Sequence, residues 1–264
     1  MTQLAGRSQA QGPSCHDDGT TRVAPEGAPI VALAGTPNVG KSTLFNALTG
    51  ARRTMGNWPG TTVEVGRGLW RPERSGTAYD LVDLPGAYSL DATSPDEELT
   101  RDLIVTPVDQ RPDVVVLVAD AAHLSRSLYL LAELREREQR VVVALTMTDV
   151  AQRRGITVDP RRLSAATGVP VLALDPRART GLAALGHAIA DSLAHPHLAA
   201  RTRGPGQAGD SLDQADERFA WLDAAVDAAV DRHAQVRRTW SDRVDALVMH
   251  RVLGPVVFLA VMWL

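Results

Sequence analysis

The residues best suited to chemistry form one glycine-rich run, G-T-P-N-V-G-K-S, at positions 35–42. The run fits the pattern G-x-x-x-x-G-K-[ST], and it lies between an apolar stretch at 30–34 and a helical stretch at 42–48. In such a loop, backbone N–H groups bind phosphate oxygens, a lysine reaches the β and γ phosphates, and the hydroxyl binds Mg²⁺. The predicted phosphate contacts are Gly35, Thr36, Pro37, Asn38, Val39, Gly40, Lys41, Ser42 and Thr43.

Two further segments would complete a magnesium and γ-phosphate site. The sequence D-L-P-G at 83–86 follows a predicted strand, so Asp83 would hold Mg²⁺ through water and the Gly86 N–H would meet the γ phosphate. Taken alone, D-x-P-G is also a common surface turn. Between the two motifs, G-N-W-P-G-T-T places Thr62 in a loop where it could close over Mg²⁺, with Thr61 as its rival and Gly60 beside them.

The residues expected at the base are less regular. Asp149, in T-M-T-D at 146–149, can accept both the N1 and N2 hydrogens of guanine, and adenine offers no such pair, so we expect GTP to be favoured over ATP. Thr146 stands where an asparagine amide normally braces the phosphate-binding loop and the base, and Met147 replaces a lysine that stacks on the purine. The last base loop is predicted at Asp175, Pro176 and Arg177, where a proline without an N–H replaces the usual serine.

These motifs lie on an alternation of apolar strands and helices. Strands are predicted at 30–34, 114–119, 141–145 and 171–174, with helices at 42–48, 125–138, 160–166 and 182–193. Residues 63–70 and 77–82 follow each other without a helix, which predicts an antiparallel hairpin at the sheet edge. The fold class is therefore α/β, a Ras-like P-loop GTPase with a mostly parallel six-stranded sheet, followed by a small all-α domain.

Composition divides the chain into four predicted parts. Residues 1–28 are rich in Gly, Ser, Gln and Pro and predict a disordered tail, and residues 29–195 hold the nucleotide-binding domain. Helical patterns at 213–236 and 241–249 predict a small helical domain over 196–250, to which the resemblance described below gives a regulatory role. The uncharged run at 252–264 is shorter than a membrane span, so we interpret 251–264 as the start of a first transmembrane helix; a buried helix or strand is the alternative.

Charge and cysteine content exclude several protein classes. The 31 acidic and 28 basic residues give a formal charge of −3, which argues against nonspecific nucleic-acid binding. The single cysteine, Cys15, cannot form an intramolecular disulfide or a thiolate zinc cage. Asp96, Glu97 and Glu98 could suggest an iron site, but acids in the first turn of a helix complement its dipole without any metal, and we favour that interpretation.

Four segments together resemble one family. They are GTPNVGKSTLFNALTG (35–50), GNWPGTTVE (56–64), DLPGAYSL (83–90) and ALTMTD (144–149), and they are similar to the N-terminal cytosolic part of FeoB, the bacterial ferrous iron transporter. The second segment discriminates best, because most P-loop GTPases lack Asn-Trp-Pro-Gly. Thr62 then occupies the position of the family's Mg²⁺-sensing threonine. Thr36, Thr146 and Pro176 depart from the family pattern.

The resemblance implies an architecture, a location and partners. It implies a G domain, a helical domain that influences nucleotide release (GDI-like), and a polytopic membrane domain, at the cytosolic face of the bacterial inner membrane. The implied partners are GTP and GDP, the protein's own C-terminal membrane domain, a small cytosolic Feo accessory protein and further copies of itself, with no nucleic acid.

The resemblance also implies a potassium-stimulated mechanism. Ala87 follows D-x-x-G where Ras-type enzymes carry the glutamine that orients water, so water must be positioned otherwise. In the implied class, Asn38 and carbonyls at 56–58 hold K⁺ against the phosphates; alternatively Asn38 only braces the loop. The expected catalytic residues are Asn38, Lys41, Thr62 and Gly86. The expected metal ligands are Ser42, Thr62 and Asp83 for Mg²⁺, and Asn38 for K⁺.

The function predicted is therefore a GTP-binding and GTP-hydrolysing cytosolic portion of a ferrous iron membrane transporter, gating or driving iron uptake. The alternative is a soluble switch GTPase of the ribosome-assembly or tRNA-modification type. That alternative predicts a basic accessory domain, whereas residues 210–231 are on balance acidic.

Overall fold

The computed structural model describes residues 24–25, 27–50, 54–57, 64–72, 77–91, 94–105, 111–195, 211–232 and 262–263. Its strands are β1 (Ile30–Ala34), β2 (Thr54–Asn57), β3 (Glu64–Trp70), β4 (Tyr79–Asp83), β5 (Val114–Asp120), β6 (Val141–Thr146), β7 (Ile156–Val158), β8 (Val171–Ala173) and β9 (Val230–Arg232). Its helices are α1 (Lys41–Thr49), α2 (Pro95–Val105), α3 (Leu124–Glu136), α4 (Thr148–Arg153), α5 (Pro160–Thr167), α6 (Leu182–Ala194) and α7 (Ser211–Ala229), with a 3-10 turn, η2 (Ala121–His123).

Within these residues, seven strands form the main sheet in the order β2-β3-β4-β1-β5-β6-β8. The β4-β1-β5-β6-β8 part is parallel, and β2-β3 and β3-β4 are antiparallel pairs. The predicted α/β fold is confirmed, but the six-strand count and the placing of the hairpin at the edge are wrong. The edge strand is β2, whose sequence T-M-G-N has no apolar alternation, so only its pairing with β3 makes it a strand.

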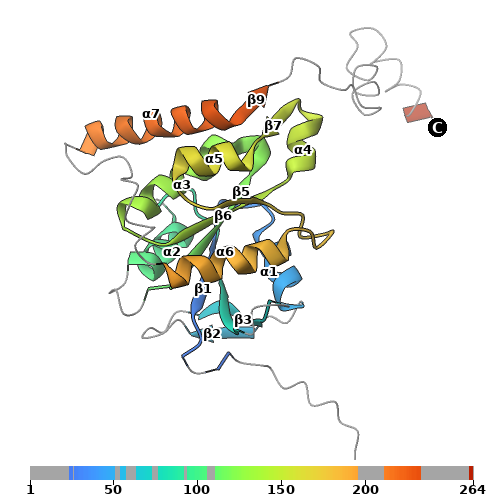
Figure 1. Cartoon of the computed structure of the whole chain (residues 1–264), viewed down its shortest axis with the longest axis vertical. Helices are drawn as coiled ribbons and strands as arrows, with labels where there is room; N and C mark the ends of the chain where they lie inside the picture. The colour runs from blue at the N-terminus through green and yellow to red at the C-terminus, as the bar shows by residue number, and fades with distance from the viewer. Residues whose placement is uncertain are drawn as a thin grey trace, which may run out of the picture.

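Two apolar layers cover the sheet because successive strand residues point to opposite faces. In β1, Val31 and Leu33 pack with α1 and α6, while Ala32 and Ala34 pack in the layer that contains α3 and α5. Figure 1 shows α6 on one side of the sheet and α3 and α5 on the other. The valine-rich β5 and β6 are buried on both faces, as expected for central parallel strands.

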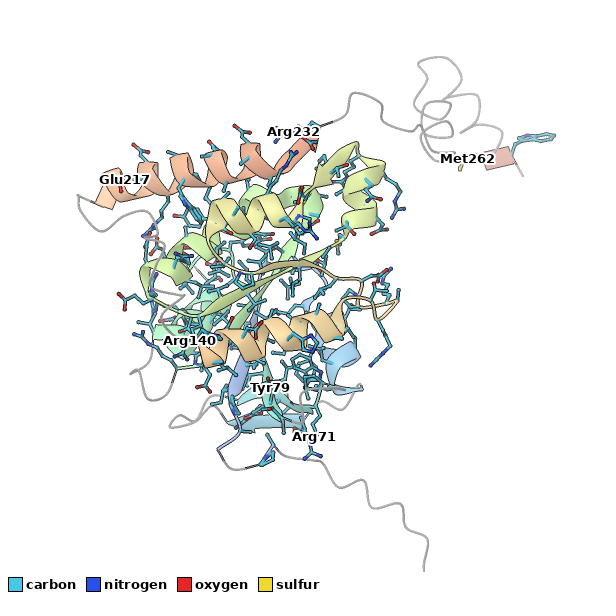
Figure 2. The ribbon with its side chains drawn as sticks, in the orientation of Figure 1. Arg71, Tyr79, Arg140, Glu217, Arg232 and Met262 are labelled. Carbon is cyan, nitrogen blue, oxygen red and sulfur yellow. The ribbon has the colours of Figure 1, made fainter. Side chains whose placement is uncertain are left out.

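Helix α7 belongs to the second of these layers. Its side chains at Leu222, Ala225, Val226 and Ala229 are buried in the same cluster as the α3 and α5 residues. Figure 1 shows α7 in orange running across α3 and α5, and Figure 2 places Glu217 and Arg232 toward opposite ends of the α7–β9 segment. Helix α7 therefore packs directly on the nucleotide-binding fold.

The predicted helix at 213–236 is wrong at its C-terminal end. The helix stops at Ala229, and residues 230–232 form β9, which pairs antiparallel with β7 in a small separate sheet. The Asp159 N–H, directly after β7, donates to the Ala229 carbonyl at 2.9 Å, so the last carbonyl of α7 is satisfied without another helical turn. The predicted helix at 241–249, residues 1–23 of the predicted 1–28 tail, and most of 251–264 lie outside the described residues. Among described helices, none has the length and apolar character needed to cross a membrane.

Candidate nucleotide-binding site

The phosphate-binding loop (residues 35–42) connects β1 to α1, as predicted. Gly35 has φ 149°, and a Cβ at this position would lie 2.5 Å from the Val118 carbonyl oxygen, so only glycine lets the loop pass β5. Gly40 has φ 91° and caps α1, and its carbonyl accepts a hydrogen bond from Leu44 at 2.9 Å. Both glycines of the motif are therefore required by the backbone.

The loop is anchored by some residues and presents others. Thr36 and Val39 are buried at 4% and 3% exposure, whereas Pro37 and Asn38 are exposed. Asn38 has a positive φ of 64°. In the first turn of α1, Ser42 and Thr43 are also exposed. Polar atoms at 38, 42 and 43 are thus available at the N-terminus of a helix, where anions are favoured.

Lys41 and Asp83 bring the two motifs together. Asp83 ends β4 and pairs in register with Leu33 of β1, so its carboxylate comes beside the start of α1. The Lys41 Nζ lies 3.4 Å from the Asp83 Oδ1, and both side chains are largely buried. The Ser42 hydroxyl and the Asp83 carboxylate are hard oxygen donors, the ligand type that Mg²⁺ prefers, so the donor set fits a magnesium ion.

The residues after Asp83 lie against the phosphate-binding loop. A Cβ on Gly86 would come 2.9 Å from Pro37 Cγ and 3.1 Å from the Pro37 backbone nitrogen. The Ala87 N–H donates to the Gly35 carbonyl at 3.1 Å, and Ala87 is fully buried. The D-L-P-G sequence is therefore not an isolated surface turn; it lies at the edge of the predicted phosphate site.

Thr146, which stands where an asparagine amide is usual, braces the phosphate-binding loop with its hydroxyl. The Thr146 Oγ1 lies 2.7 Å from the Val39 carbonyl oxygen and 3.2 Å from the Ala119 carbonyl oxygen. A hydroxyl has one proton, so the shorter contact is the principal hydrogen bond. Since Thr146 is 2% exposed, water does not replace this bond readily.

Asp149 presents its carboxylate at the surface in the first turn of α4. Met147, two residues earlier, caps α4 with a positive φ of 54° and is half-buried. The Asp149 carboxylate forms an ion pair with Arg153 of the same helix, whose Nε also donates to the Asp149 carbonyl at 3.2 Å. An exposed pair of this kind is weak, so the carboxylate remains available to an incoming base.

The loop at 175–180 is held by its own aspartate. The Asp175 Oδ1 accepts hydrogen bonds from the N–H groups of Arg177 and Ala178 at 2.9 and 3.1 Å. Backbone bonds between Asp175 and Thr180, 3.0 and 3.2 Å long, close the loop. Pro176 lies between Asp175, which accepts these hydrogen bonds, and Arg177, the first donor, so the turn needs no N–H group at position 176.

Several predicted site residues are not placed at this site by the described part of the structure. Gly60, Thr61 and Thr62, and Trp58 of the expected potassium carbonyls, lie outside the described residues, while Gly56 and Asn57 belong to β2. At the predicted acidic cluster, α2 begins at Pro95, so 96–98 form its first turn as expected. Across the part of the chain that the structure describes, no three His, Cys, Asp or Glu residues are grouped as a metal site.

Sequence reasoning missed Glu133 and treated Glu97 only as an acid in the first turn of a helix, whereas both hold the residues after Gly86. The Glu97 Oε1 accepts a hydrogen bond from the Tyr88 N–H at 3.1 Å. Glu133 accepts from Ser89 Oγ at 2.9 Å and from the Leu90 N–H at 2.6 Å. The available signal for Glu133 was an acid placed between leucines on the apolar face of a helix.

The fold and site define a Ras-like P-loop GTPase domain: a mostly parallel sheet, a glycine-rich loop opening α1, and D-L-P-G packed against that loop. The family model for ferrous iron transport protein B matches residues 29–189, more than half of the chain. The chain therefore belongs to the FeoB family.

Individual relatives agree with this assignment. The Fe(2+) transporter FeoB of Legionella pneumophila (strain Paris) is 41% identical over 157 residues, covering 58% of this chain and 20% of that protein. A Porphyromonas gingivalis Fe(2+) transport protein A/Fe(2+) transporter FeoB fusion protein is 41% identical over 161 residues, covering 61% and 19%. The chain thus spans about a fifth of the length of these relatives.

The fold is shared with a solved structure of the family. The cytosolic domain of the T. maritima FeoB iron transporter, in its GMPPNP form, matches with a TM-score of 0.63 at 29% identity. The match covers 77% of this chain and 99% of that chain.

Proposed function

We propose that this chain binds and hydrolyses GTP as the cytosolic portion of a ferrous iron membrane transporter, where it gates or drives iron uptake. The observation that carries the proposal is the packing of Gly86 and Ala87 against the phosphate-binding loop beside the Lys41–Asp83 pair. A γ phosphate bound at Lys41 would lie next to the Gly86 N–H, so its loss on hydrolysis would be felt by the segment that follows. Membership of the FeoB family supports this reading over a soluble switch GTPase.

The residues of the site divide the work of phosphoryl transfer. Lys41 and the loop N–H groups bind the phosphates, and Ser42 and Asp83 would hold Mg²⁺, which neutralises charge developing on the phosphate oxygens. Ala87 has no group that could orient water. We propose that the exposed amide of Asn38 binds K⁺ beside the phosphates, which supplies positive charge in place of an arginine finger. Thr62 is proposed to complete the magnesium site, with Gly60 and Thr61 beside it.

Guanine selectivity is proposed to rest on Asp149. Its exposed carboxylate can accept from both guanine N–H groups, and the hydrogen-bonded Asp175 loop, with Pro176 and Arg177, would cover the other side of the base. Met147 and Thr146 would lie beside the base.

The wider assembly is also proposed. Residues 196–250 would act as a helical regulatory domain that includes α7, and the protein would lie at the cytosolic face of the bacterial inner membrane and act together with a membrane domain of the transporter. The fusion protein of P. gingivalis supports a small Feo accessory protein as a partner, because fused chains are held at high effective concentration.

The test is nucleotide binding and steady-state hydrolysis, GTP against ATP, with Mg²⁺ in K⁺ or in Na⁺. We expect turnover of GTP in preference to ATP, and K⁺ stimulation of about tenfold, equivalent to about 1.4 kcal/mol of transition-state stabilisation. The Asn38→Ala variant should lose the K⁺ stimulation while binding GDP normally, and Asn46→Ala, an exposed asparagine of α1, is the matched control. Equal stimulation of Asn38→Ala would overturn the potassium assignment, and equal use of ATP would overturn the role of Asp149.

A further inference from the structure

Helix α4, which carries Asp149, has little packing of its own. It is six residues long, its one buried side chain is Ala151, and Figure 1 shows it beside β7 at one edge of the fold. Among the residues that the structure describes, one side-chain hydrogen bond joins 148–154 to another element, and it comes from Arg154, which caps the C-terminal end of α4. The direction of Asp149 therefore depends on how the far end of a short helix is held.

His123 of η2 receives this hydrogen bond. The Arg154 Nη1 lies 2.9 Å from the His123 Nε2, and the His123 Nδ1 lies 2.7 Å from the Asp120 Oδ2. A guanidinium can only donate and a carboxylate can only accept, so the ring between them carries its proton on Nδ1 and accepts at Nε2. His123 is therefore a neutral imidazole whose single donor and single acceptor are both in use.

Asp120 anchors this chain of contacts to the central sheet. It is the last residue of β5 and pairs in register with Thr146, which supports the phosphate-binding loop. Its other carboxylate oxygen, Oδ1, accepts from the Ala122 N–H at 2.8 Å, and its own N–H donates to Ser127 Oγ at 3.1 Å. The Asp120 side chain is 14% exposed, so His123 is held by a residue with a well-defined position.

We propose that His123 and Arg154 are positioning residues for base recognition: the contact from Asp120 through His123 to Arg154 holds the end of α4 against the sheet and thereby sets the direction of the Asp149 carboxylate. The inference rests on the proposed recognition of guanine by Asp149. The start of α4 follows β6 directly, so the contact fixes the second end of the helix. Without it, the last turn is held only by Ala151 and by the chain that continues into β7.

The expected effect is small for stability and measurable for the base. The His123 side chain is 57% exposed and Arg154 is exposed, so losing their hydrogen bond should leave unfolding in urea unchanged. One exposed contact of this kind corresponds to about two- to fivefold in an equilibrium constant. Hypoxanthine keeps the N1–H of guanine and lacks its N2 amino group. The preference for GDP over inosine diphosphate therefore reports how well Asp149 is aimed at the second N–H group.

The first experiment measures the affinities of the whole chain for GDP and inosine diphosphate by titration. Wild type should prefer GDP by about tenfold, as expected for a hydrogen bond to a charged group. His123→Leu should lower this preference to about threefold, and His123→Gln should retain most of it, because an amide also has a donor and an acceptor. His187→Leu, an exposed histidine of α6, is the matched control. An unchanged preference in His123→Leu would overturn the proposal.

Arg154 is tested by combining it with His123. Arg154→Met should lower the preference for GDP as much as His123→Leu does, and the double variant should lower it no further, because both changes break the same contact. Arg161→Met, an exposed arginine of α5, should have no effect. Additive losses in the double variant would mean that the two residues act separately, which contradicts the proposed contact.

A measurement without nucleotide separates this inference from the proposed function. In the nucleotide-free chain, amide hydrogen exchange in peptides covering 147–155 should be about threefold faster in His123→Leu than in wild type, and unchanged in His187→Leu. Unchanged exchange in His123→Leu overturns the positioning role. If exchange is faster in His123→Leu while wild type binds ADP as tightly as GDP, the hold on α4 is supported and the proposed guanine recognition fails.

Discussion

Replacing Thr146 by valine removes one hydroxyl and keeps the shape of the side chain. The change leaves the Val39 carbonyl, in the middle of the phosphate-binding loop, without the donor that now lies 2.7 Å away. A hydrogen bond contributes about 1 kcal/mol net, and a buried acceptor left without a donor costs about 1 to 3 kcal/mol. We therefore expect the binding-competent loop to be disfavoured by about 2 kcal/mol, which weakens GDP affinity by roughly 30-fold.

The matched variant is Thr146→Ser, which keeps the hydroxyl and loses a buried methyl group. It should lose about 1 kcal/mol of unfolding free energy and retain its affinity for GDP. Titration with a fluorescent GDP analogue and urea unfolding of each variant measure the two quantities. If Thr146→Val binds GDP within twofold of wild type, the contact between Thr146 and Val39 does not support the loop and the reasoning fails.

Two further substitutions test the backbone of the site and the docking of α7. Gly35→Ala should abolish nucleotide binding in a titration, because its Cβ would lie 2.5 Å from the Val118 carbonyl oxygen. The control, Gly50→Ala, is also at positive φ but in open space, so it should cost only about 1 kcal/mol of stability. Equal effects of the two variants on nucleotide binding would contradict the steric argument. Leu222→Ala should lower the free energy of unfolding in urea by about 2 to 5 kcal/mol, because Leu222 is 2% exposed. Phe219→Ala should cost less, because Phe219 is 54% exposed. A loss under about 1 kcal/mol for Leu222→Ala would mean that α7 is not part of the folding unit.

The phosphate site could be predicted from sequence because its residues are demanded locally. Gly35 and Gly40 adopt backbone conformations that other residues resist, and Lys41 and Ser42 follow them directly in the chain. The central strands were equally predictable, since β5 and β6 are nearly continuous valine and leucine runs. In these segments local pattern and tertiary environment agree.

Features that depend on distant partners could not be predicted. Thr146 supports Val39 across 107 positions of sequence, whereas its residue type alone shows only that the usual asparagine amide is missing. The strands β2 and β9 are strands only because β3 and β7 pair with them. Glu133 is polar in a leucine-rich helix, and its role becomes visible only when Ser89 and Leu90 contact it from 44 and 43 residues away. Tertiary pairing decides structure where local preference is weak.

The small β7–β9 sheet has a mechanical consequence. It pairs three residues antiparallel, Ile156 with Arg232 through Val158 with Val230, and β7 begins three residues after the end of α4, the helix that carries Asp149. A force applied to the chain beyond Arg232 would pull first on the Ile156–Arg232 end of this ladder and peel it open one pair at a time. Tension on the downstream chain would therefore be delivered close to α4, which begins two residues after Thr146, the residue hydrogen-bonded to the phosphate-binding loop.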